Sequence, residues 1–440
     1  MTAATRHHRR ADASTLIRYI AEHSEGKGGL WLPPRTGLNN LIMPGSNGIT
    51  WTRAGVKTVL NSSGTVVDLA SGQFDPMGWV EAAVTNIWLQ SEKYNTTPNQ
   101  RFQTTVTENN AVAPDGTTTA SKILIGNNGT AQYSVFQSMT LAASNYAYSH
   151  HVKQGSGVDW IYINGDFGGT TAGAWFNIST GQKGSKSAGT NDYKIETLAN
   201  GWYRISASDT EGTGAARFFR VQPVSGDTAI TFAGDGTQFF YLWGSQNEVG
   251  NFATSYIPTT TLAVARVADQ PVASSISEID NNQMTYAIRY YQPAAMTSMP
   301  GSFPTLFMHT HETATEESVR VIGTTSSGAL AVQIRDAGAT VGVDQLWDSS
   351  QNQAGFHTLV MSCKSGDSFY MKNNEPLELN TGAFTWNSGN TAHNKIYFGH
   401  DDGGTLQGGF RILGALYIPN YAVGRVEARQ LQHMLERVAV

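Results

Sequence analysis

Residues 278–283 come closest to the pattern of a polysaccharide hydrolase. Cleaving a glycosidic bond needs two carboxyl groups, one acting as an acid and the other as a base or nucleophile. Glu278 and Asp280 are close together, but Gln283 takes the position where the pattern Glu-x-Asp-x-x-Glu has its last carboxylate. An amide cannot deliver a proton as a carboxylic acid does. The segment is therefore interpreted as a polar loop before the next strand.

Histidines and carboxylates at two places have the composition of a metal site. His309 and His311 would share one face of a strand, with glutamates at 312, 316 and 317 close behind, and imidazole with carboxylate suits transition metals. The segment 400–404, His-Asp-Asp-Gly-Gly, offers oxygen ligands but lacks the spacing of a calcium loop. Spacing alone is a weak signal, since exposed loops have the same composition. We predict no metal site and no cofactor.

The sequence has none of the compact motifs of an activated serine, a zinc protease or a phosphate-binding loop. The single cysteine, Cys363, lies in the alternating segment 358–363, which is typical of a strand. We expect a buried, inert thiol there. The sequence therefore predicts no catalytic residues and a protein that is not an enzyme.

Three aromatic residues are the candidates for contact with a sugar: Trp160, Tyr162 and Trp175. A flat ring offers an apolar face to the C–H groups of a pyranose, while neighbouring amides and carboxylates satisfy the hydroxyl groups. Trp160 and Tyr162 are two residues apart and so share one face of the expected strand. The core of a β-sandwich uses the same residue types, so packing is the competing interpretation.

Short apolar or alternating segments, separated by turn signals, dominate from Glu81 onward. Asn164-Gly165 and Asn200-Gly201 are expected turns, because both residue types accept the positive φ of tight hairpins. Strands without intervening amphipathic helices favour antiparallel sandwiches. The predicted fold is mainly β, with two antiparallel jelly-roll β-sandwiches. A short helix starting near Asp12 and an extended arm precede them, and a short helix follows at residues 426–438.

Composition divides the chain into an N-terminal arm at 1–80, a first sandwich at 81–268 and a second at 269–440. The arm has a basic cluster at 7–10, Pro33-Pro34 and too little apolar material for its own core, so it should lie against another domain or subunit. The net charge of −5 and the pI near 6.1 argue against a nucleic-acid partner. The absence of a long apolar segment predicts no membrane insertion, and without a secretory signal we expect cytoplasmic synthesis.

Four segments resemble successive signatures of a jelly-roll, carbohydrate-binding-like module found in tailed-phage particle proteins. They are VEAAVTNIWLQSE at 80–92, APDGTTTASK at 113–122, NGWYR at 200–204 and YLWGSQNEVGNFATSYIPT at 241–259. The last of these is the most specific. The resemblance covers roughly residues 60–269.

The region from Met284 to Leu435 more weakly resembles a concanavalin-like or laminin-G-like sandwich. The resemblance rests on segments 355–360, 368–371, 396–399 and 409–414 and on a terminal helix, in the order that such modules show. Residues 372–374, Lys-Asn-Asn, replace the Asp-Gly turn of those modules. Ligand or calcium binding is therefore not carried over.

These resemblances imply a structural protein on the surface of a tailed-phage particle, made in the cytoplasm of the host bacterium. We expect the arm to attach to other virion proteins and the lectin-like sandwiches to project as homo-oligomers, trimers being common in such appendages. Weak contacts with bacterial surface glycans would then gain avidity from the number of copies. The alternative is a capsid decoration or head-fibre protein without a ligand. A polysaccharide depolymerase is a third, weaker hypothesis.

Overall fold

In a computed structural model the chain folds as a mainly β protein with antiparallel sheets and short helices near its ends, as the sequence predicted. The structure describes residues 13–23, 29–31, 49–73, 75–167, 170–211, 214, 216–274, 283–299, 304–310, 318–324, 326–336, 339–342, 353–373, 375–379, 395–400 and 409–438. No helix within these ranges is both long and apolar enough to cross a membrane.

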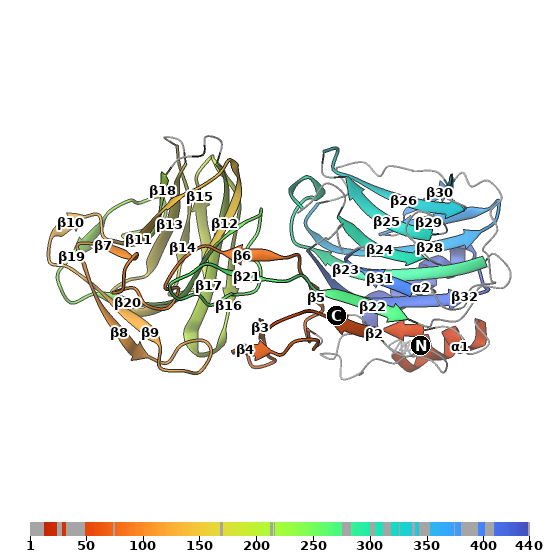
Figure 1. Ribbon diagram of the computed structural model, residues 1–440, viewed down its shortest axis with the longest axis horizontal. Helices are drawn as coiled ribbons and strands as arrows, with labels where there is room; N and C mark the ends of the chain where they lie inside the picture. Colours follow the sequence, from red (N-terminus) through yellow and green to blue (C-terminus); the bar gives the residue numbers. More distant parts are fainter. Residues whose placement is uncertain are drawn as a thin grey trace, which may run out of the picture. The chain divides into compact units, whose positions relative to one another are not determined.

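The chain divides into two compact units, and each is built from separated stretches of sequence. Unit 1 comprises Met1–Arg53, Gly72–Ala82 and Ala268–Val440, and unit 2 comprises Ala54–Ser71 and Ala83–Val267. Unit 2 therefore consists of two insertions into the sequence of unit 1. Figure 1 shows that each unit has two facing sheets.

Two six-stranded antiparallel sheets form the sandwich of unit 2. The β13 sheet has the order β15 (Gln182–Lys186), β14 (Thr170–Asn177), β13 (Trp160–Phe167), β18 (Ala216–Val224), β11 (Ser134–Thr140) and β7 (Gln100–Phe102). The β12 sheet has the order β16 (Thr190–Thr197), β17 (Trp202–Glu211), β12 (Ser144–Ser156), β20 (Phe239–Val249), β9 (Ala120–Ile125) and β8 (Thr104–Ala111). Three short pairs complete the unit: β10 (Gly129–Ala131) with β19 (Phe232–Gly234), β6 (Val84–Asn86) with β21 (Val264–Arg266), and β3 (Lys57–Leu60) with β4 (Val66–Leu69).

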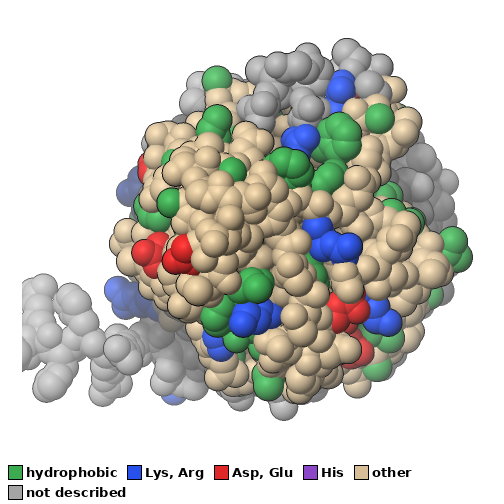
Figure 2. All heavy atoms as spheres, turned by 90° about the vertical axis from the view of Figure 1, so that its left-hand side faces the viewer, with side chains coloured by type: hydrophobic (Ala, Val, Ile, Leu, Met, Phe, Trp, Pro, Cys, Tyr) green, Lys and Arg blue, Asp and Glu red, His purple; other side chains and the backbone are tan. Residues whose placement is uncertain are grey.

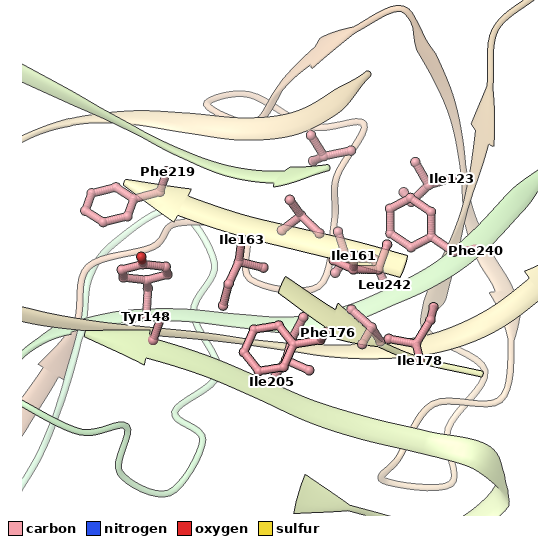
Figure 3. Packing of buried hydrophobic residues seen from close by; sticks show 14 of the residues in the cluster. Ile123, Tyr148, Ile161, Ile163, Phe176, Ile178, Ile205, Phe219, Phe240 and Leu242 are labelled. Carbon is pink, nitrogen blue, oxygen red and sulfur yellow. The ribbon is translucent and has the colours of Figure 1, made fainter. Parts of the chain in front are cut away.

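The core of unit 2 lies between its two sheets. Ile161 and Ile163 of β13 and Phe176 of β14 are fully buried there, against Ile205 of β17 and Leu242 of β20 (Figure 3). Burying each such side chain stabilises the fold by about 1.5–3 kcal/mol. Because strand residues alternate between faces, the intervening residues of β13 and β14 must lie on the outer face of the β13 sheet.

Unit 1 is a second antiparallel sandwich, with one sheet covered by helices. The β23 sheet has the order β1 (Gly29–Trp31), β32 (Phe410–Pro419), β23 (Gln283–Gln292), β28 (Gly355–Lys364), β29 (Ser368–Lys372) and β30 (Glu375–Leu379), and β5 (Trp79–Val80) also pairs with β32. The facing sheet has the order β2 (Ile49–Thr52), β22 (Gln270–Ser274), β31 (Lys395–Phe398), β24 (Thr305–Thr310), β25 (Ser318–Thr324), β26 (Ala329–Asp336) and β27 (Ala339–Gly342). A 3₁₀ turn lies at Met296–Ser298.

Residues 13–80 were expected to belong to one N-terminal arm, but they are shared between the two units. Helix α1 (Ala13–His23) buries Leu16 and Ile20 completely, in the same cluster as Leu431 of helix α2 (Arg425–Val438) and Val360 of β28. Strands β1, β2 and β5 all pair with strands of unit 1, whereas the β3–β4 hairpin belongs to unit 2. The apolar face of α1 and the short strands find their partners within the same chain.

A buried ion pair in unit 1 brings together three of the four segments that lead into unit 2, and a backbone hydrogen bond joins the fourth. The Arg53 guanidinium donates to Asp269 at 2.9 Å, and both side chains are fully buried. The same carboxylate accepts the indole N–H of Trp51 at 3.1 Å and the backbone N–H of Glu81 at 3.0 Å. The N–H of Gly72 donates to the carbonyl of Arg53 at 3.1 Å. Three of these four segments meet at a single carboxylate.

The two expected Asn-Gly turns have different outcomes. Asn200 and Gly201 have φ of 57° and 76° and close the hairpin between β16 and β17, as predicted. Asn164 and Gly165 instead lie inside β13, so that prediction was wrong. Asn164 is buried, and its side-chain amide donates to Gln222 of β18, so a partner distant in sequence holds it in the strand.

Candidate functional site

The structure brings the three predicted aromatic residues together on the outer face of the β13 sheet. Tyr162 of β13 lies directly opposite Trp175 of β14 in the strand register. Trp160 is two residues before Tyr162, so it shares this face, while Ile161 and Ile163 point into the core. The expected common face of Trp160 and Tyr162 is therefore present, and Trp175 joins it from the neighbouring strand.

The rings of Tyr162 and Trp175 stack face to face. Their centroids are 4.1 Å apart and their planes differ by 12°, and only 3% and 8% of the two residues is exposed. The indole N–H of Trp175 donates to the carbonyl of Ala229 at 2.6 Å. Burial raises the pKa of the Tyr162 phenol, which keeps the phenol neutral at physiological pH. The packing interpretation fits these two rings, whereas Trp160 stays half-buried at their side.

Polar side chains continue the same face across β13 and β18. Asn164 donates to Gln222, and Arg220 donates to Asn164 at 3.4 Å. The guanidinium of Arg220 also lies 5.0 Å from the ring centroid of Phe218. Amide and guanidinium groups on the same sheet face as a partly exposed indole can contact the hydroxyl groups and the C–H face of one extended glycan. We call Trp160, Asn164, Arg220 and Gln222, with Phe218, the β13 outer face.

Sequence patterns alone did not indicate the polar members of this face. Asn164 was assigned to a turn, and Arg220 and Gln222 were not singled out, although they alternate with the buried Phe219 and Val221 along β18. That alternation was a usable signal for one shared face. Their alignment with Asn164 depends on the register of β13 with β18, which single-strand patterns do not give.

Of the candidate metal ligands, the structure describes His309 and His400, and both are buried in unit 1. His309 is fully buried in unit 1, where its ring contacts Tyr417 edge-on and hydrogen-bonds the Tyr286 hydroxyl, so it packs in the core. His400 is also buried, with a ring nitrogen 3.2 Å from the carbonyl of Pro271. His311 and residues 312, 316, 317 and 401–404 lie outside the described residues. Within the described part of the chain, no group of three or more metal-binding side chains occurs.

Of the hydrolase-like segment and the cysteine, the structure describes only Gln283 and Cys363. Glu278 and Asp280 lie outside the described residues, and Gln283 begins strand β23. Cys363 is buried, as expected, and burial raises the pKa of its thiol to about 12. The thiol is therefore protonated at neutral pH and shielded from reaction.

One carboxyl group has a strongly perturbed pKa but lies in the interior of unit 2. Asp209 is fully buried, and burial raises its pKa to about 6 against a hydrogen bond from Tyr148. A carboxyl group with such a pKa could act as an acid if a substrate reached it. Since Asp209 is closed off between the sheets, we assign it a structural role.

No protein-family model matches the sequence, and no curated protein matches it. Among solved structures, the chain is similar to domains LG4-5 of the mouse laminin alpha1 chain, with a TM-score of 0.23, 9% identity, and coverage of 68% of this chain and 95% of that one. It is also similar to the N-terminal CBM22-1-CBM22-2 tandem domain of Paenibacillus barcinonensis Xyn10C, with a TM-score of 0.25, 9% identity, and coverage of 76% and 96%. At these TM-scores the fold assignment rests on the sheets described above.

Proposed function

We propose that the protein is a non-enzymatic structural protein on the surface of a tailed-phage particle, and that it binds bacterial surface glycans through the β13 outer face. The observation that carries the glycan proposal is the connected row of Asn164, Arg220 and Gln222 on the same sheet face as the half-buried Trp160. The virion assignment is supported by the resemblance of residues 241–259 to phage particle proteins.

Surface charge favours a neutral or weakly charged ligand over nucleic acid. On the side of the molecule in Figure 2, Lys and Arg (blue) and Asp and Glu (red) are scattered among uncharged surface. The net charge of −5 has the same implication, because proteins that neutralise phosphates present a basic surface. We propose homo-oligomers attached to other virion proteins, so that weak sugar contacts are multiplied.

A glycan array with the recombinant chain tests the binding proposal. We expect saturable binding to host-surface glycans, at least ten-fold weaker in Trp160→Ala. Val112→Ala is the matched control, because its side chain is 52% exposed at the end of the other sheet. Equal loss in the two variants, or no saturable binding by the parent chain, contradicts the proposal.

The second candidate is a capsid decoration or head-fibre protein without a ligand. The stacked, buried pair of Tyr162 and Trp175 favours it, since two of the three predicted sugar-binding rings serve packing. Cryo-electron microscopy of purified particles separates the two: density over the capsid lattice supports decoration, and density at the tail supports adhesion. Absence of the chain from purified particles by mass spectrometry contradicts both. Release of reducing ends from host polysaccharide would instead support a depolymerase.

A further inference from the structure

The outer face of the other sheet of unit 2 carries a second set of partly exposed rings. Phe239 and Tyr241 lie two residues apart on β20, and the alternating residues Phe240 and Leu242 are fully buried in the core. Phe239 and Tyr241 are half-buried, and their rings contact edge to face at 5.4 Å. Unlike Tyr162 and Trp175, these rings do not stack face to face.

Two lysines flank these rings in the strand register. Lys122 of β9 and Lys153 of β12 are both paired with Tyr241, one on each side of β20. With strands 4.7–4.9 Å apart, their backbones are about 9.6 Å from each other. The amino group of Lys122 lies 4.0 Å from the centroid of Phe239. We call Lys122, Lys153, Phe239 and Tyr241 the lysine–aromatic patch.

A glycine at position 155 allows the patch to form. A Cβ at Gly155 would lie 2.4 Å from the ring of Phe239, closer than real contacts allow. The ring of Phe239 therefore lies against the backbone of β12, at the place where a register shift interrupts its pairing with β20. This fixes one ring of the patch before any ligand arrives.

The other half of this sheet face is covered. Trp202, Trp243 and Tyr256 are buried there with Val66 of the β3–β4 hairpin, in a cluster that Tyr241 only borders. The lysine–aromatic patch is the part that this cluster leaves accessible, and its four side chains are each half-buried.

The charge of the patch selects its ligand. In the described residues, neither Lys122 nor Lys153 forms an ion pair with a carboxylate, so both amino groups remain available to an anion. A pyranose that carries a carboxylate could pack against Tyr241 beside Phe239 and reach a lysine on either side. We infer that this patch binds acidic polysaccharide, as a second contact surface distinct from the β13 outer face. The inference rests on the proposed glycan-binding function and names the sugar class.

Titration with polygalacturonate at low salt, followed by calorimetry, tests the inference. We expect saturable binding that Lys122→Gln with Lys153→Gln weakens at least ten-fold, and that rising salt weakens further. Lys93→Gln with Lys183→Gln is the control of equal net charge, since both lysines are exposed elsewhere on unit 2. Equal weakening in the two double variants overturns the inference.

A second pair of measurements tests the role of the ring. Phe239→Ala keeps both charges and should weaken polygalacturonate binding about five-fold or more, with folding checked by circular dichroism. Inorganic polyphosphate should bind more weakly than polygalacturonate at equal charge. Equal binding of the two polymers, or no effect of Phe239→Ala, would show a generic anion surface and overturn the inference.

The two proposals fail in different ways. Loss of polygalacturonate binding with intact, Trp160-dependent binding of neutral glycans overturns only the lysine–aromatic patch. Failure of the parent chain to bind any glycan, neutral or acidic, overturns the proposed function and the patch together.

Discussion

Unit 2 draws both of its large sheets from one stretch of chain, residues 83–267, whereas the sheets of unit 1 combine strands from both ends of the sequence. In unit 1, Gly29 of β1 pairs with Tyr417 of β32, and Ile49 of β2 pairs with Ala273 of β22. This difference shows that an N-terminal segment with little apolar content can still pack into a core whose other residues are far away in the sequence. It also implies that N-terminal changes should damage unit 1 and spare unit 2.

The largest expected effect on stability comes from disrupting the packing of helix α1 in unit 1. Leu16→Ala with Ile20→Ala removes two fully buried side chains and should lower the free energy of unfolding of unit 1 by about 5 kcal/mol. Hydrogen exchange with mass spectrometry should show faster exchange in β23 and β32 and unchanged exchange in β12 and β13. Val426→Ala, 72% exposed on α2, is the control. Equal acceleration in unit 2 would contradict the comparison.

The next effect concerns the buried ion pair. Arg53→Met leaves the carboxylate of Asp269 buried without its cation and should cost unit 1 about 3–5 kcal/mol. The matched control is Lys194→Met in unit 2, whose pair with Glu196 spans 2.7 Å but is 43% and 36% exposed, so its loss should cost about 1 kcal/mol or less. Chemical denaturation measures both changes, and similar costs would remove the special role of the Arg53 pair.

A third prediction concerns how the free energy of unfolding of unit 2 depends on pH. Burial lowers the pKa of His150 to about 3, whereas an unfolded histidine titrates near 6.5. As the pH falls through this window the unfolded state takes up a proton that the folded state does not, so the free energy of unfolding falls. His150→Gln should therefore lose about 3 kcal/mol less stability between pH 7 and pH 4 than the parent chain.

Asp209 is the control for that measurement, because its titration should raise the free energy of unfolding as the pH falls, whereas that of His150 should lower it. Its folded pKa is raised to about 6, so the folded state takes up a proton before the unfolded state and gains stability as the pH falls toward 4. Asp209→Asn should remove this gain and steepen the acid loss. Identical pH profiles in the parent and both variants would show that neither group contributes.

The smallest expected effect concerns the hairpin of unit 2 that the sequence predicted. Gly201 has a φ of 76°, so Gly201→Ala should cost about 1 kcal/mol. Gly226→Ala is the control, because a Cβ there meets no atom within 4 Å, and it should leave the stability nearly unchanged. Thermal denaturation compares the two, and equal shifts would contradict the conformational explanation.

Local patterns predicted the features that depend on neighbours in sequence. Alternation placed Trp160 and Tyr162 on one face, and the turn at Asn200 followed from its residue type. Pairing between distant strands decided the rest. The stacking of Tyr162 on Trp175 requires the β13–β14 register. The β13–β18 register puts Gln222 opposite Tyr162, two residues from Asn164, and the hydrogen bond between Asn164 and Gln222 holds Asn164 in the strand. No short window of sequence contains these relations.

The pairing of β1 with β32 also determines when, during synthesis, the N-terminal segment can complete its folding. About 390 residues separate the two strands, and ribosomes add about 5–20 residues per second. Helix α1 and strand β1 therefore wait roughly 20–80 s for their partners, while the strands of unit 2 emerge and pair in the meantime. During this interval the apolar side chains of Leu16 and Ile20 lack their native contacts. The yield of folded chain in a cell should accordingly depend on chaperones that shield the nascent N-terminus.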